Sequence, residues 1–396
     1  RYLVHGLDTD AKVVAAAREH LLSMGAYGPV SVDVFDGRRL PYIDNMVNLV
    51  VADDLGSVPM AEVMRVLCPG GVAQIDGKKT VKPRPADMDE WTHWLYGPGN
   101  NAVSRDKRVG VSRNLQWIMP PRWSRHHNLL PSVSAMVSAG GRLFTIIDEG
   151  PISVKGVGDK WALVARDAFN GMLLWKRPMP KWGWKQWSDV EFSVQMRFKG
   201  PDQTFRRLVA VGDVVYATLG FDEPIVALDA ATGKTIRTYK GTEKVSEVLY
   251  RDGLLVLARN APGAGKNILT LDAETGAVRW EKTGYKGVTA RTDELARFTD
   301  AYVTVGDDCV YFLDRDHVVA LELTTGKEAW RRARPEVKEG VMDRLKYNHT
   351  NLCTLVYRSG RLFLGQRDPF GDNLNKRQVK DMEDMTVLAM DGRTGK

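Results

Sequence analysis

The most regular pattern in the chain is a strand–turn–strand unit that recurs five times. In each copy, alternating apolar residues lead to an acidic residue, then to a short polar stretch that ends in Gly, and then to a second strand that often closes on Trp. The copies read ARDAFNGMLLW (165–175), VALDAATGKTI (226–236), LTLDAETGAVRW (269–280), VALELTTGKEAW (319–330) and AMDGRTGK (389–396). Apolar alternation predicts strands, and five copies of one pattern predict a repeat architecture rather than unrelated hairpins.

The residue types of this unit suit a tight connection between two strands. The Gly accepts a left-handed backbone conformation because it has no Cβ, and the acidic side chain can accept hydrogen bonds from backbone N–H groups of its own turn. The Trp offers a large flat surface for contact with a neighbouring unit. A polar turn and an apolar strand precede each copy, at 140–146, 212–218, 252–257, 306–313 and 359–365. Each unit therefore holds about four strands, which predicts one blade of a β-propeller.

Residues 1–77 follow a different pattern, in which strands alternate with helices. We expect strands at 2–10, 30–36, 46–53 and 71–75, and helices at 11–25 and 59–71. A Gly closes the first helix, whereas a Pro opens the second and a Pro-Gly-Gly sequence closes it. Alternation of this kind predicts a partial, Rossmann-like α/β domain with a parallel sheet.

Between these two patterns lies a stretch with neither of them. Residues 78–90 are charged and rich in Pro, which is typical of a linker. Residues 91–101 are aromatic and rich in turn residues, and we expect them to pack against the propeller. The chain therefore divides into an α/β domain at 1–77, a connecting segment at 78–112 and an all-β propeller at 113–396.

The two ends of the chain fall inside predicted elements. The chain starts at Arg1 with a strand, and its last repeat stops at the Gly-Lys of its turn. We therefore expect both ends to be cuts in a longer protein. The propeller should then be incomplete, with about five of seven or eight blades.

Composition and charge narrow the class of protein only a little. The chain of 396 residues is 43% hydrophobic and 27% charged, as in an ordinary soluble protein. The net charge is +7, but the basic residues are scattered, which argues against a specific nucleic-acid site. Cys68, Cys309 and Cys353 are isolated and form no zinc, haem or redox motif. No apolar run reaches the roughly 18 residues of a membrane span, and no signal peptide is visible.

The repeats resemble those of bacterial PQQ-like β-propellers, the group that includes quinoprotein dehydrogenases and BamB-type outer-membrane assembly scaffolds. The resemblance covers 113–396 and implies a fold rather than an activity. Residues 114–118 are similar to the opening strand of such propellers, which often completes the last blade. Quinoprotein dehydrogenases typically carry adjacent cysteines and a calcium site beside the quinone, and we find neither pattern in this sequence. PQQ is therefore not expected as a cofactor of this chain.

The first domain resembles the middle of the class I SAM-dependent methyltransferases, through residues 6–10, 35–51 and 63–71. By this resemblance, Asp8 corresponds to the acidic residue that accepts hydrogen bonds from both ribose hydroxyls of SAM. Asp36 corresponds to the residue that contacts the adenine amino group. A carboxylate suits the ribose because it offers two acceptor oxygens to two donors.

The chain departs from the methyltransferase pattern at both ends of this domain. The family's glycine-rich loop would lie before Arg1, and the later strands of the family's sheet are not expected after Ile75. SAM binding should therefore be weak or absent in this chain. The alternative to a cofactor site is that Asp8 and Asp36 are turn residues of a degenerate domain.

Adjacent His126 and His127 lie in the densest polar and aromatic cluster of the sequence. On a strand they would point to opposite faces, so they can share a metal only from a loop, with a further ligand such as His93. Hydrogen bonding at the surface or between blades is the simpler interpretation. We therefore assign no metal site and keep both residues as candidates for ligand binding.

A second candidate for ligand binding is an aromatic cluster in an insertion between blades. It contains Trp182, Trp184 and Trp187, interleaved with Lys181 and Lys185. These side chains could form a stacking platform for a sugar or another ring, or they could cap a blade.

Three functions remain open, and no catalytic residue can be assigned. The preferred one is a binding or scaffold propeller joined to a degenerate methyltransferase-like domain, with a protein or carbohydrate-like ligand on the propeller surface. The second is a SAM-dependent methyltransferase whose propeller recognises the substrate or partner. The third, a PQQ-dependent oxidoreductase, lacks the quinone-site pattern. The propeller resemblance favours a location outside the cytoplasm, whereas an active methyltransferase domain would favour the cytoplasm, where SAM is made.

Overall fold

The computed structural model describes most of the chain in two compact units. The described residues are 2–111, 115–120, 133–150, 160–183, 186, 202–260, 265–288, 301–334, 353–367 and 385–396. Unit 1 comprises Arg1–Asp89, Arg105–Ile118 and Asp167–Leu174, and unit 2 comprises Glu90–Ser104, Met119–Arg166 and Trp175–Lys396. The first unit thus extends beyond residue 77, into the segment that the sequence assigns to a linker.

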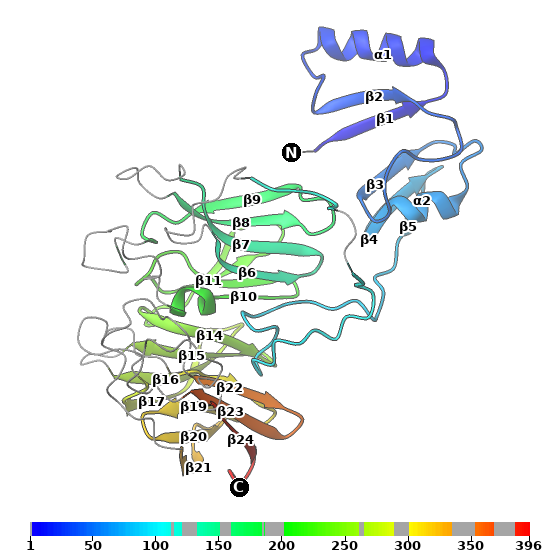
Figure 1. Ribbon diagram of the computed structural model, residues 1–396. Coiled ribbons are helices and arrows are strands. Elements are labelled where there is room, and N and C mark those ends of the chain that lie inside the picture. Colours follow the sequence, from blue (N-terminus) through cyan, green and yellow to red (C-terminus); the bar gives the residue numbers. More distant parts are fainter. Residues whose placement is uncertain are drawn as a thin grey trace, which may run out of the picture. The chain divides into compact units, whose positions relative to one another are not determined.

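Unit 1 contains two small sheets, each with a helix (Figure 1). In the first sheet, two parallel strands are joined by a helix: β1 (Val4–Asp8), α1 (Ala11–Ser23) and β2 (Val30–Val34). The second sheet contains β3 (Val47–Ala52), α2 (Met60–Val66), β4 (Leu67–Ile75) and β5 (Lys78–Val81). Strand β4 pairs in parallel with β3 and antiparallel with β5. The alternation of strands and helices expected from the sequence is therefore present.

Two details of unit 1 differ from the expectation. Helix α2 ends at Val66 instead of residue 71, and the Pro-Gly-Gly sequence lies inside β4. The cause is strand pairing: the backbone at Gly71 approaches β3 so closely that a Cβ there would lie 3.1 Å from the carbonyl oxygen of Val47. In addition, Lys78–Val81 is a strand rather than the start of a linker.

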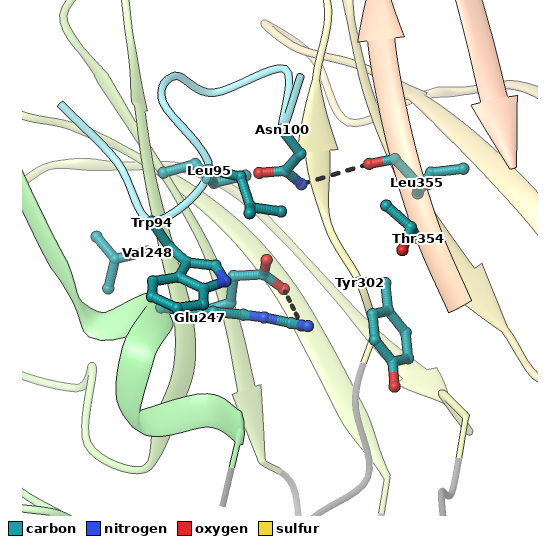
Figure 2. A pocket seen from close by; sticks show the side chains of 10 residues that line it. Trp94, Leu95, Asn100, Glu247, Val248, Tyr302, Thr354 and Leu355 are labelled. Atoms are coloured by element: carbon teal, nitrogen blue, oxygen red, sulfur yellow. Dashed lines mark hydrogen bonds and ion pairs between the residues drawn. The ribbon is translucent and has the colours of Figure 1, made fainter. Parts of the chain in front are cut away.

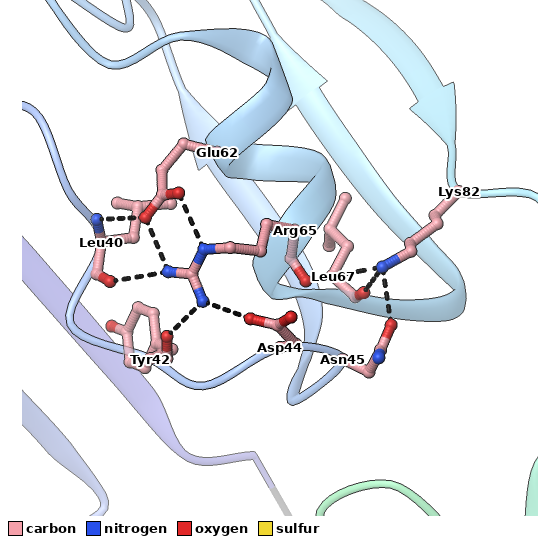
Figure 3. Close-up of polar contacts among 8 residues, drawn as sticks. All are labelled: Leu40, Tyr42, Asp44, Asn45, Glu62, Arg65, Leu67 and Lys82. Atoms are coloured by element: carbon pink, nitrogen blue, oxygen red, sulfur yellow. Dashed lines mark hydrogen bonds and ion pairs between the residues drawn. The ribbon is translucent and has the colours of Figure 1, made fainter. Parts of the chain in front are cut away.

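The end of α2 is held by a network of charged side chains (Figure 3). The Arg65 guanidinium donates hydrogen bonds to Glu62 and Asp44, and these carboxylates hold the pKa of Arg65 above its usual range. The Lys82 ammonium group donates to the carbonyl oxygen of Leu67 and to Asn45, both at 2.7 Å. A cation at this position stabilises the carbonyl end of the helix and fixes the turn from α2 into β4.

Unit 2 is built from sheets that repeat one antiparallel arrangement (Figure 1). Blade 1 contains β6 (Val133–Ala139), β7 (Arg142–Asp148), β8 (Trp161–Asp167) and β9 (Leu173–Pro178). Blade 2 follows the short helix η1 (Asp202–Arg207) and contains β10 (Leu208–Val211), β11 (Val214–Thr218), β12 (Ile225–Asp229) and β13 (Thr235–Thr238). Blade 3 contains β14 (Val245–Arg251), β15 (Leu254–Asn260), β16 (Lys266–Asp272) and β17 (Val278–Tyr285).

The same arrangement continues toward the end of the chain. Blade 4 contains β18 (Thr304–Val305), β19 (Cys309–Asp314), β20 (His317–Glu322) and β21 (Glu328–Ala333). Blade 5 contains β22 (Cys353–Arg358), β23 (Arg361–Arg367) and β24 (Met385–Asp391). The sequence prediction of one four-stranded blade for each repeat is confirmed for blades 1 to 4, and blade 5 shows three strands.

The first strand of each blade is the inner one. Strand β6 contacts β10, β10 contacts β14, β14 contacts β18, and β18 contacts β22. The apolar residues between successive blades form continuous core clusters, because each sheet buries the face that it turns toward a neighbouring sheet. This arrangement of twisted sheets around the first strands is that of a β-propeller.

The acidic residue of each repeat closes its own turn, as the sequence predicts. Asp229 accepts hydrogen bonds from the backbone N–H and the hydroxyl of Thr232, at 2.7 and 2.6 Å. Asp272 makes the equivalent pair of bonds with Thr275, both at 2.8 Å, and these bonds lower the pKa of Asp272 to about 2. The carboxylates therefore organise the turns as charged acceptors.

The aromatic residue of each repeat packs on the Gly of the following turn. Trp175 lies against Gly233, and its indole N–H donates to the Ala230 carbonyl oxygen at 2.9 Å. The same contact is made by Trp280 on Gly326, Trp330 on Gly395 and Trp117 on Gly171, with Tyr239 taking the aromatic position beside Gly276. No strand includes Trp117 among the described residues 115–120, although an opening strand is expected there.

We predict that Gly233→Ala destabilises unit 2 by about 2–4 kcal/mol. Gly233 has a φ of +69°, and an added Cβ would lie 2.6 Å from the indole of Trp175. The matched control is Gly212→Ala, because Gly212 has a φ of +56° but an added Cβ would meet nothing within 4 Å. Urea unfolding should show a loss of only about 1–2 kcal/mol for this control. Equal losses for the two variants would contradict the proposed role of the aromatic contact.

Candidate functional site

A segment that belongs to no strand crosses the inner strands of all five blades. We call Glu90–Ser104, which unit 2 includes, the strap. It is the aromatic, turn-rich stretch that the sequence predicts to pack against the propeller, and this prediction is confirmed. The strap pairs with blade 1 through Trp91 and Ser138, and the Thr92 carbonyl oxygen accepts from the Ala210 N–H of blade 2 at 3.0 Å.

The strap continues in the same way across the remaining blades. His93 accepts a hydrogen bond from the Tyr250 N–H of blade 3 at 3.0 Å. The Pro98 carbonyl oxygen accepts from Val305 of blade 4, and the Gly99 carbonyl oxygen accepts from Tyr357 of blade 5. These partners lie at or next to the last residue of each inner strand. The strap therefore lies at the end of the propeller where the inner strands finish.

His93 fastens the strap from inside the protein. It is 2% exposed, and a backbone N–H can only donate, so the Nε2 that accepts from Tyr250 carries no proton. The proton therefore sits on Nδ1 and is donated to the Thr92 hydroxyl oxygen at 2.7 Å. Burial lowers the pKa of His93 to about 3. A neutral imidazole with both nitrogens occupied is a structural residue and not an available metal ligand.

A small pocket lies between the strap and the inner strands of blades 3 to 5 (Figure 2). Its volume is about 30 Å³, which is about the share of one water molecule in the liquid and far below the roughly 300–1,000 Å³ of a typical small-molecule site. The strap contributes Trp94, Leu95 and Asn100 to its lining, and Asn100 donates to the carbonyl oxygen of Val303 at 2.8 Å.

One buried ion pair gives this pocket its polar character. Arg206, at the end of η1, lies 3.7 Å from Glu247 of β14, and the two side chains are 8% and 6% exposed. Glu247 also accepts a hydrogen bond from the Val303 N–H at 3.0 Å. The guanidinium lies over the ring of Tyr302, 4.8 Å from its centroid. Both charges are therefore held rigidly, in a place with little water.

The aromatic part of the pocket is also fixed. Trp94 stacks on Phe205, with ring centroids 4.8 Å apart and an interplanar angle of 18°. Thr354 and Leu355 of β22 complete the lining on the opposite side. The pocket thus combines apolar surface with one cation, one anion and a hydroxyl.

Unit 1 brings the two predicted cofactor residues to one edge of its first sheet. Asp8 is the last residue of β1 and pairs in register with Val34, two residues before Asp36. Asp8 accepts a hydrogen bond from the Asp10 N–H at 2.8 Å. Asp36 accepts from the N–H groups of Arg38 and Arg39, which lower the pKa of its carboxyl group. Both carboxylates therefore follow the carboxyl ends of adjacent parallel strands.

The aromatic candidates fare differently in the structure. Trp182 is 2% exposed and packs in the core with Phe221 and Arg207, so it does not form the open stacking surface considered from the sequence. The other candidates, His126, His127, Trp184 and Trp187, lie outside the described residues. The insertion pattern alone gave no signal that Trp182 turns inward.

The sequence reasoning did not single out Trp94, Arg206, Glu247 or Tyr302 as site residues. Arg206 and Glu247 stand in no motif, because their pairing depends on how η1 packs against β14. The aromatic density of 91–101 was the one usable signal for the strap. Among the described residues, no group of three or more His, Cys, Asp or Glu side chains could hold a metal ion.

The class of protein follows from the repeat and the blades. Residues 159–361 match the protein family described as outer membrane protein assembly factor BamB. The match spans just over half of the chain, and the chain belongs to this family. The resemblance to PQQ-like, BamB-type propellers is therefore confirmed. No curated protein matches the chain.

Several solved structures are similar to this chain in fold. A europium-containing methanol dehydrogenase is 14% identical with a TM-score of 0.45, and the match covers 78% of this chain and 57% of that one. The quinohemoprotein alcohol dehydrogenase from Comamonas testosteroni is 17% identical with a TM-score of 0.43, over 78% and 48% of the two chains. BamB from Moraxella catarrhalis is 16% identical with a TM-score of 0.36, over 69% and 75%. These likenesses are too low to carry a functional argument.

No helix in the described part of the chain is long and apolar enough to cross a membrane.

We predict that unit 2 loses stability as the pH falls from about 6.5 toward 3, because of His93. The unfolded chain binds a proton at the ordinary pKa of 6.5, whereas the folded state does so only near its pKa of about 3. Stability that is present above pH 6.5 is therefore lost at about 1.4 kcal/mol per pH unit across this window. Chemical unfolding at several pH values measures the slope.

The variant His93→Gln should flatten this slope, because an amide keeps an acceptor for Tyr250 but does not titrate. His317→Gln, at the start of β20, is the control and should keep the slope of the unmodified chain. An unchanged slope in His93→Gln would show that other groups cause the acid sensitivity.

Proposed function

We propose that this chain is a binding or scaffold module, in which a PQQ-like propeller presents one end to a partner and is joined to a methyltransferase-like α/β domain. The observation that carries the proposal is an asymmetry between the two ends of the propeller. At the strap end, the connections are short turns, such as Val211 to Val214 and Asp272 to Val278. At the other end, the connections run from Asp148 to Trp161, from Tyr285 to Thr304 and from Ala333 to Cys353.

Long connections on a rigid scaffold are where binding proteins vary their contacts. We call this end of the propeller the loop end. The sequence candidates His126, His127, Trp184 and Trp187 lie outside the described residues. These residues stay candidates for ligand binding, either to a protein or to a carbohydrate-like ligand.

The family supports a protein as the partner, because the family is described as an outer membrane protein assembly factor. An extracytoplasmic location is proposed on the same ground. The europium-containing methanol dehydrogenase is only 57% covered by this chain, so the activity and partners of the whole protein are part of the proposal.

We predict that a partner cross-links from the loop end and not from the strap end. A photoreactive residue would replace Asp316, which is 78% exposed in the turn between β19 and β20. The matched control would replace Asp213, which is 84% exposed in the turn between β10 and β11 at the strap end. Covalent adducts formed in cells should appear for Asp316 alone. Equal labelling from both positions, or none from either, would refute the proposed binding end.

A second candidate function is SAM-dependent methylation with the propeller as recognition domain. Its support is the position of Asp8 and Asp36 after adjacent parallel strands, where α/β sheets bind ligands. In the methyltransferase fold, the first strand of the sheet lies between the second strand and the fourth strand. Here β1 would correspond to the second strand and β3 to the fourth. Without its first strand, such a sheet would divide into two parts. In this chain β1 and β2 form one sheet, and β3 and β4 belong to another.

We predict that SAM binds this chain only weakly, because Asp8 and Asp36 already accept hydrogen bonds from backbone N–H groups of their own turns. Asp8→Ala should remove the residual affinity, by a factor of about ten or more, with little effect on stability. Glu19→Ala on the exposed side of α1 is the control and should leave binding unchanged. Titration calorimetry decides this: micromolar SAM affinity that survives Asp8→Ala would mean that the site is misassigned.

A PQQ-dependent oxidoreductase is the least supported function. The pocket beside the strap has a volume of about 30 Å³, which is small for a three-ring cofactor, and it contains Trp94 but no pair of adjacent cysteines.

A further inference from the structure

The pocket beside the strap is closed on one side. The strap bonds to the ends of the inner strands in all five described blades, so it lies across that end of the propeller. Glu247 is the third residue of β14 and Thr354 the second residue of β22, and both therefore lie nearer the starts of their strands. The strap therefore forms the floor of the pocket, on the side where the inner strands finish.

The charges of the pocket favour a neutral ligand. Arg206 and Glu247 are one cation and one anion, 3.7 Å apart and both buried. An anion placed between them would gain from Arg206 but be repelled by Glu247, and a cation would meet the reverse situation. Because burying a net charge is costly, the pair best accommodates a group that both donates and accepts hydrogen bonds.

The rest of the lining narrows the ligand class further. Trp94 offers aromatic surface for C–H groups, and the Thr354 hydroxyl can donate or accept. A volume of about 30 Å³ is about the share of one water molecule in the liquid, so the pocket admits one or two hydroxyl groups and not a ring. Adjacent hydroxyl groups on a saturated ring match these features: one donates to Glu247, another accepts from Arg206, and the C–H groups contact Trp94.

We propose that this pocket binds the edge of a neutral sugar through two adjacent hydroxyl groups, with Glu247 as acceptor, Arg206 as donor and Trp94 as the apolar floor. This inference deepens the proposed binding function by naming the ligand class for a pocket of the same propeller. It adds no chemical step, because the bound hydroxyls are held and not transformed.

The test compares rings that differ in charge. Titration calorimetry and saturation-transfer NMR on the 396-residue chain would use D-glucose, D-galactose and D-mannose as neutral probes, with D-glucuronate and D-glucosamine as charged counterparts. At least one neutral hexose should bind more tightly than both charged sugars. Its affinity should change little with salt, because no net charge is neutralised.

Conservative variants link the binding to the pocket. Glu247→Gln keeps an acceptor for Val303 but loses the charge, and Arg206→Lys keeps the charge but loses the planar fork. Each should weaken binding by about tenfold or more. Asp213→Asn, at the exposed strap end, is the control and should bind normally. Thermal unfolding of every variant shows whether a loss of binding is only a loss of folding.

Several outcomes would overturn the proposal. One is binding of no neutral hexose at 100 mM, roughly the weakest affinity these methods detect. Another is tighter, salt-sensitive binding of glucuronate, which would make this an anion site centred on Arg206. A third is sugar binding that stays normal in folded Glu247→Gln and Arg206→Lys. Cross-linking from Asp316 without sugar binding would leave the proposed binding function standing and reject only the sugar pocket.

Discussion

The contact between an aromatic ring and the Gly of the next turn is the interaction on which the propeller depends. In a repeat protein each unit packs mainly on its immediate neighbours, so each junction between blades has to be secured locally. In this chain, Trp175 and Trp280 each bury a large apolar surface on the following blade. The indole N–H of each donates a hydrogen bond to a backbone carbonyl oxygen in the turn that the ring covers. The Gly is required for two reasons: its backbone has a positive φ, and a Cβ at this position would occupy the space of the aromatic ring.

The strap adds the longer-range connection that the junctions lack. Its hydrogen bonds run to every described blade. The Asn100 side chain by itself connects two of them, because it donates to the carbonyl oxygens of Val303, next to β18 of blade 4, and of Leu355 in blade 5. The buried, neutral His93 shows that this segment is integrated in the core and is not a loose linker. Because the strap lies across the end of the propeller where the inner strands finish, the proposed binding end is the opposite one.

The α/β unit shows the element order that the sequence predicts, but its two candidate cofactor residues have two interpretations. Its strands and helices appear in the expected order, and the charged network around Arg65 fixes the short connection from α2 to β4. The residues that would meet a cofactor, Asp8 and Asp36, are held by hydrogen bonds from their own loops. Such bonds are what a turn residue makes and also what orients a carboxylate toward a ligand, so the geometry is compatible with both interpretations of the domain.

The sequence by itself determined the local structure of this protein. The period of two in apolar residues predicted the strands, and the acidic residue, Thr and Gly of each repeat predicted the turns, because these preferences act within a few residues. The sequence placed the end of α2 too late, since the pairing of β4 with β3 overrides the local signal of Pro-Gly-Gly. Only the tertiary structure decided that Trp182 is buried and that Arg206, Glu247 and Trp94 meet in one pocket. Those residues are distant in the chain. Local sequence preferences carry no information about which distant residues the packing of blades brings together.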